Sequence, residues 1–145
     1  MSEVITSLNQ QLSNWNVLYV KLHNYHWNVK GRDFFTLHAK FEELYNEASV
    51  NIDEIAERVL ALGGVPVGKL ADYLTYSSLK EAEGSEKSAA MVSQIIQDFK
   101  TIVSESQEII EQAAEASDDT TIDLMTGVVV ALEKHIWLFN AFLGE

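Results

Sequence analysis

The chain has no cysteine, which excludes a disulfide framework, a zinc ribbon and a thiolate nucleophile. It also has no run of 18 apolar residues, so a membrane-spanning helix is not expected. Basic residues are scarce: 10 Lys and Arg stand against 22 Asp and Glu, and a net charge of −12 disfavours attraction to nucleic acid or anionic membranes. The first residues lack the basic and apolar regions of a secretory signal, so we expect a soluble cytoplasmic protein.

Only one proline and seven glycines occur, and they lie between long stretches with helical apolar periodicity. The periodicity predicts helices over about residues 3–29, 34–62 and 85–116, and a last helix that includes Ile122 to Leu143. Gly31 and Asp33 are expected to end the first helix and to cap the second. The connection over residues 67–84 is apolar enough for one short helix.

Four such helices, each with one main apolar stripe, predict a single all-α domain over residues 1–145. The connection between helices two and three is long enough to run the length of the bundle, which would make those two helices parallel. This arrangement is a ferritin-like four-helix bundle with one crossover. A short extra helix is expected within that crossover.

Four residues in the first half of the chain could be metal ligands: His26, His38, Asp53 and Glu57. Imidazole and carboxylate groups without sulfur suit Fe(II), Mn(II) or Zn(II), and open coordination positions suit iron–oxygen chemistry. His38 and Asp53, however, lie on one predicted helix at a separation of about 22 Å. No single metal ion can contact both, so a second subunit must supply one half of any joint site.

The alternative for Asp53 and Glu57 is a solvated acidic stripe with Arg58 as its ion partner, because acidic pairs at four-residue spacing are common on helices. A conventional di-iron centre within one bundle is disfavoured, because such bundles carry Glu-x-x-His motifs on two helices. None of the four histidines has a glutamate three residues before it. The predicted bundle core is apolar instead.

Several segments together resemble the signature of the Dps family (DNA-binding protein from starved cells, or mini-ferritin), and the likeness extends over essentially the whole chain. The combined pattern is far more specific than any one segment. The segments are Leu22–Gly31 (LHNYHWNVKG), Phe35–His38 (FTLH), Asp53–Arg58 (DEIAER), the Gly63-Gly64 turn with Pro66, and Lys134–Trp137 (KHIW).

The resemblance implies a ferroxidase site at a two-fold interface between subunits, holding one or two iron ions (Fe2+/Fe3+). One chain would supply His26 and His38, and its neighbour would supply Asp53 and Glu57. A two-fold axis between antiparallel second helices brings opposite helix ends together, which removes the separation along one helix. Glu42, four residues after His38, is left open as a further ligand or as a hydrogen-bond partner of an imidazole N–H.

The family also has acidic three-fold pores through which Fe(II) enters, in the region that precedes the last helix. Asp119 and Asp123 are the pore candidates here, beside Asp118. The alternative is that these aspartates serve as caps and interact favourably with the helix dipole, as expected near a helix N-terminus.

The resemblance further implies a homo-oligomer, a hollow dodecamer that oxidises Fe(II), preferably with hydrogen peroxide, stores ferric mineral and so protects DNA. DNA-binding members commonly carry a Lys/Arg-rich tail, whereas residues 1–12 contain no basic residue. We therefore expect no strong direct DNA binding. Two alternatives are a nucleoid-associated DNA-binding protein with secondary iron oxidation, and a structural helical assembly whose interface is idle.

Overall fold

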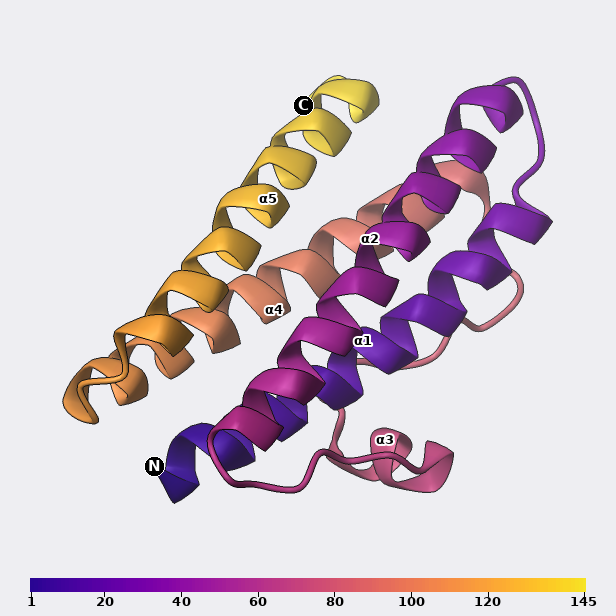
Figure 1. Ribbon diagram of the computed structural model, residues 1–145. Helices are drawn as coiled ribbons and strands as arrows, with labels where there is room; N and C mark the ends of the chain where they lie inside the picture. Colours follow the sequence, from indigo (N-terminus) through magenta and orange to yellow (C-terminus); the bar gives the residue numbers. More distant parts are fainter.

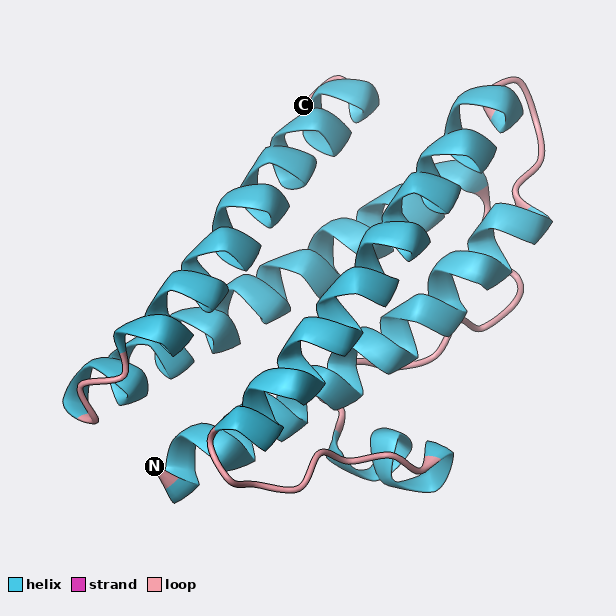
Figure 2. Ribbon diagram, viewed as in Figure 1, coloured by secondary structure: helices cyan, strands magenta, loops and turns pink.

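The computed structural model describes all of residues 1–145 and contains five helices and no strand (Figures 1 and 2). Four long helices form the bundle, and the short α3 packs against α1 within the crossover. Helices α2 and α4 run in the same direction, as predicted from the long crossover (Figure 1). The helices are α1 (Ser2–Asn28), α2 (Phe34–Ala61), α3 (Leu70–Tyr76), α4 (Ser88–Glu115) and α5 (Asp119–Leu143).

The predicted helix ends agree with the structure to within a few residues, and the differences are local. Helix α4 begins at Ser88 rather than at residue 85. Asp33 occupies the N-cap position of α2, but its side chain makes no capping hydrogen bond. Gly31 has a φ of +107°, yet α1 already ends at Asn28 with the extended Val29 as its cap, so Gly31 serves the turn between the helices rather than the helix end itself.

The core is mainly apolar, with a cluster of 28 buried hydrophobic residues, and its end near the α1–α2 turn contains an aromatic layer. Phe139 of α5 lies 6.5 Å from both Phe41 of α2 and Phe99 of α4, and Tyr25 of α1 lies 5.8 Å from Phe41, measured between ring centroids. All four side chains are buried, and each contributes about 1.5–3 kcal/mol through burial.

None of the helices combines the length and the apolarity that crossing a membrane requires.

A buried ion pair ties the crossover to the bundle. The Nζ of Lys21 on α1 lies 2.8 Å from Oδ2 of Asp98 on α4, and it donates a hydrogen bond of 2.9 Å to the carbonyl of Lys80 in the crossover. Burial raises the pKa of Asp98, and the Lys21 ammonium opposes that rise. Three segments distant in sequence therefore meet at one buried cation.

A second polar anchor involves Tyr25, the residue that precedes His26. The hydroxyl of Tyr25 donates to Oε2 of Glu86 at 2.9 Å, and the backbone N–H groups of Glu83 and Gly84 donate to the same carboxylate at 2.9 and 2.8 Å. Burial would raise the pKa of Glu86, but these hydrogen bonds outweigh it and lower the pKa from 4.5 to about 2.

Glu86→Gln tests this anchor. A carboxylate whose pKa is lowered on folding stabilises the protein above its unfolded pKa, and the stabilisation is lost as the pH falls from about 4.5 toward 2. We expect the variant to lose about 1 kcal/mol of unfolding free energy at pH 7. The difference from wild type should shrink in urea unfolding series taken at decreasing pH.

Glu83→Gln is the matched control, because the side chain of Glu83 makes no hydrogen bond. It should leave the unfolding free energy unchanged at every pH. A gap between wild type and Glu86→Gln that stays constant from pH 7 to pH 2 would contradict the role assigned to the Glu86 charge.

Candidate metal centre

The short turn between α1 and α2 brings two histidine rings into contact. His26 lies in the last turn of α1 and His38 lies near the start of α2, and their rings stack with centroids 3.7 Å apart and planes at 14°. His26 is buried and His38 is partly exposed. Phe34 stacks on His38 with ring centroids 4.8 Å apart, so this ring is also held from its own helix.

Each of the two imidazoles is also tied to the backbone of the other. The Nδ1 of His26 lies 2.6 Å from the carbonyl oxygen of His38, and the Nδ1 of His38 lies 2.7 Å from the carbonyl oxygen of His26. A carbonyl oxygen can only accept, so both Nδ1 atoms carry a proton, and in the neutral imidazoles that bind metals the Nε2 atoms keep a lone pair. A backbone carbonyl that holds one ring nitrogen and leaves the other free is the usual arrangement around metal-binding histidines.

Glu42 lies beside this histidine pair. Its Oε1 is 3.9 Å from Nε2 of His26 and accepts a hydrogen bond of 3.3 Å from the hydroxyl of Tyr45. Both imidazole N–H groups already donate to backbone carbonyls, so the structure does not show Glu42 as a hydrogen-bond partner of an imidazole N–H. Burial raises the pKa of Tyr45, and the Glu42 carboxylate raises it further.

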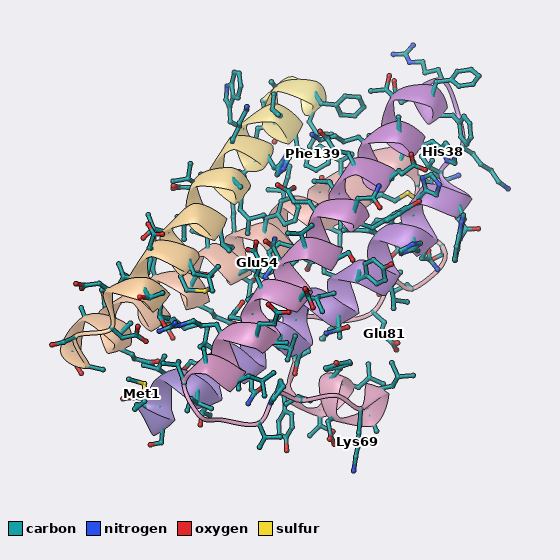
Figure 3. The ribbon with its side chains drawn as sticks, viewed as in Figure 1. Met1, His38, Glu54, Lys69, Glu81 and Phe139 are labelled. Carbon is teal, nitrogen blue, oxygen red and sulfur yellow. The ribbon has the colours of Figure 1, made fainter.

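Asp53 and Glu57 lie farther along α2, away from the histidines. Both side chains are exposed, and neither takes part in a hydrogen bond or an ion pair. Figure 3 shows His38 at one end of the bundle and Glu54, the neighbour of Asp53, well along the helix. One chain brings no group of three His, Asp or Glu side chains together that could hold a metal ion. It assembles the histidine half of the predicted site separately from the carboxylate half.

Arg58 is not the ion partner of Asp53 and Glu57, and that part of the acidic-stripe interpretation is wrong. Its Nη2 donates to Oδ1 of Asp118 at 2.7 Å, and its Nε donates to Oγ1 of Thr121 at 2.9 Å. The guanidinium therefore joins the end of α2 to the start of α5. This contact depends on how two distant helices pack, which spacing along the sequence does not reveal.

The three aspartates near the start of α5 differ in their surroundings. Asp118 is buried and caps the helix, accepting a hydrogen bond of 3.1 Å from the backbone N–H of Thr121. Burial would raise the pKa of Asp118, but hydrogen bonds from Thr121 and the charge of Arg58 outweigh it and lower the pKa. Asp119 and Asp123 are exposed and share a helix face. The capping interpretation holds for Asp118, while the pore role of the other two stays a prediction.

Tyr45 contacts both His26 and Glu42 at the candidate site, and the sequence interpretation did not name it. It lies seven residues after His38 and three after Glu42, so helical spacing alone places all three on one face of α2. That spacing was a usable signal. The reciprocal bonds between the histidine rings and carbonyls had no such signal, because they depend on the path of the turn between the helices.

Comparison with known proteins agrees with this architecture. A ferritin-like domain matches residues 5–145. The DNA protection during starvation protein of Brevibacillus brevis is 53% identical over 140 residues, covering 97% of this chain and 94% of the relative. A crystal structure of a Dps protein from Bacillus brevis is 52% identical, with a TM-score of 0.97 and coverage of 98% of this chain and 95% of that chain.

A Dps protein from Vibrio cholerae O1 is 35% identical, with a TM-score of 0.95 over 98% of this chain and 89% of that chain. Its structure is described as a member of a broad superfamily of ferritin-like diiron-carboxylate proteins. The four-helix bundle, its long crossover and the match to a ferritin-like domain together define a ferritin-like protein. Within that class, the whole-length identity to these relatives shows that the chain belongs to the Dps family.

Proposed function

We propose that the protein is a cytoplasmic iron-storage and detoxification protein that oxidises Fe(II) at sites shared between two subunits. The observation that carries this proposal is the pair of Nε2 lone pairs that His26 and His38 present, with the unpartnered Asp53 and Glu57 on the same molecule but out of reach. The diiron-carboxylate description of the Vibrio cholerae relative supports iron as the substrate.

A two-fold axis completes the site. Two α2 helices that pack antiparallel across the axis bring the start of one helix against the far end of the other. Asp53 and Glu57 of a second copy then face His26 and His38 of the first, and the same interface forms two equivalent sites. Glu42 adds an oxygen on the histidine side, because its Oε1 faces the lone pair of His26 rather than an N–H group.

The donor set suits oxidation of bound Fe(II), with one or two ions held per site. Carboxylate oxygens are hard ligands that favour Fe(III) over Fe(II), while the neutral imidazoles hold the incoming ion. Hydrogen peroxide is the oxidant we propose. One peroxide takes one electron from each of two Fe(II) ions and two protons from the solution, and it yields two Fe(III) ions and two water molecules. When a site holds two Fe(II) ions, both electrons are delivered as the O–O bond breaks, so no hydroxyl radical is released.

Entry of Fe(II) and storage of ferric mineral require an assembly of several chains, which we propose is a hollow dodecamer. Asp119 and Asp123 are exposed at the start of α5 and would line acidic pores that attract Fe(II). The ferric product would be stored as mineral inside. Protection of DNA then follows from removing iron and peroxide, in keeping with the name of the Brevibacillus brevis relative.

Asp53→Ala/Glu57→Ala tests the carboxylate half. After anaerobic loading with Fe(II), peroxide should produce ferric absorbance rapidly in the wild type and more than about 10-fold more slowly in the variant. Glu111→Ala/Glu115→Ala is the matched control, because it removes two exposed carboxylates at the same four-residue spacing from α4. Equal initial rates in wild type and Asp53→Ala/Glu57→Ala, with the assembly intact by size-exclusion chromatography, would refute the proposed site.

Direct DNA binding is the property that would favour a nucleoid-associated protein instead. The net charge is −12 per chain, and residues 1–12 contain no basic residue. Phosphates would therefore repel the assembly at ordinary salt. We expect no stable complex in a gel shift at low salt without added divalent metal. Stable complexes under those conditions would overturn this expectation and favour the nucleoid-associated function.

A further inference from the structure

The ring of Tyr45 is held between α1 and α2 by three other rings. It stacks on His23 with centroids 3.8 Å apart and planes at 17°, and it meets Tyr19 and His26 edge-on at 6.2 and 5.3 Å. His23 is itself held, because its Nδ1 donates to the carbonyl oxygen of Tyr19 at 2.7 Å. The phenol of Tyr45 therefore has little freedom to move relative to His26.

The hydroxyl of Tyr45 is directed at Glu42. This hydrogen bond of 3.3 Å is the only one that the Glu42 side chain makes. The Glu42 side chain is 55% exposed, so without the hydroxyl it would be free to sample several rotamers in solvent. A rigid ring thus limits the position of a carboxylate that is otherwise mobile.

When His26 is neutral, His26 itself does not attract the Glu42 carboxylate. Its Oε1 lies 3.9 Å from Nε2 of His26, and in the neutral form of His26 that binds a metal both atoms carry lone pairs, because the ring donates through Nδ1. Two acceptors that face each other at this distance are stabilised by a cation placed between them. The neutral phenol therefore holds the carboxylate where a metal ion, and not a hydrogen bond, joins it to the imidazole.

The geometry points to Tyr45 as a positioning residue that holds Glu42 near His26, as a further oxygen donor for the metal site that the carboxylates of a second copy complete. This inference rests on the proposed function and extends it to a residue outside the two halves. Tyr45 does not contact the metal. It acts by lowering the conformational freedom that Glu42 loses when a metal binds, so removal of the hydroxyl should weaken metal binding more than it slows the oxidation step.

Tyr45→Phe removes the hydroxyl and keeps the ring stack. In anaerobic titrations of the assembled protein with Co(II), followed by visible absorption, we expect the variant to bind roughly 10-fold more weakly than wild type. In Fe(II) oxidation its KM should rise while kcat stays within about twofold. Tyr19→Phe is the matched control, because this ring joins the same cluster and its hydroxyl makes no hydrogen bond; it should bind Co(II) as wild type does.

A double-mutant cycle separates positioning from general packing. Tyr45→Phe should have no further effect on Co(II) affinity in a Glu42→Ala background. Wild-type Co(II) affinity in Tyr45→Phe, or an undiminished effect of Tyr45→Phe without Glu42, would overturn the inference. Titration of Asp53→Ala/Glu57→Ala in parallel separates the proposed shared site from the positioning role of Tyr45. Unchanged Co(II) binding in this variant would refute the shared site itself. Weaker Co(II) binding in this variant, together with wild-type binding in Tyr45→Phe, would refute the positioning role alone.

Discussion

The rigidity of α2 is the constraint on which the proposed metal centre depends. The helix carries His38 near its start and Asp53 and Glu57 in its second half, and its backbone hydrogen bonds hold His38 about 22 Å from Asp53 and farther still from Glu57. No side-chain movement closes such a gap. Any metal centre that uses both groups must therefore lie between two molecules, so metal binding at the proposed site depends on assembly.

The histidine half, by contrast, is completed within one chain before any partner arrives. The ring stack and the two bonds from Nδ1 to carbonyl oxygens set both the orientation and the proton position of His26 and His38. Behind them lies the aromatic layer of the core, and Tyr25 ties the last turn of α1 to the crossover through Glu86. Ligands held in this way lose little freedom when a metal binds, which favours affinity.

Much of this arrangement could be predicted from the sequence because it follows from periodicity. Apolar spacing gave the four long helices and the short one, and the spacing of His38 and Asp53 gave the need for a second subunit. Features that depend on contacts between distant elements could not be predicted. Arg58 turns to Asp118 rather than to the acidic pair, and Asp33 takes the cap position without bonding. Tyr45 could be predicted in part: its spacing from His38 and Glu42 places it on the same helix face, but the packing of its ring against α1 cannot be derived from the sequence.

The sharing of each site between two chains is tested most directly by mixing two inactive variants. One variant carries His26→Ala/His38→Ala and the other carries Asp53→Ala/Glu57→Ala. When equal amounts of the two variants are reassembled together, half of the two-fold pairs should contain one chain of each variant. Each such mixed pair contains one intact site. If each site is shared between two chains, Fe(II) oxidation by peroxide should recover to about one quarter of the wild-type rate. Mixed assemblies as inactive as either variant alone would contradict it.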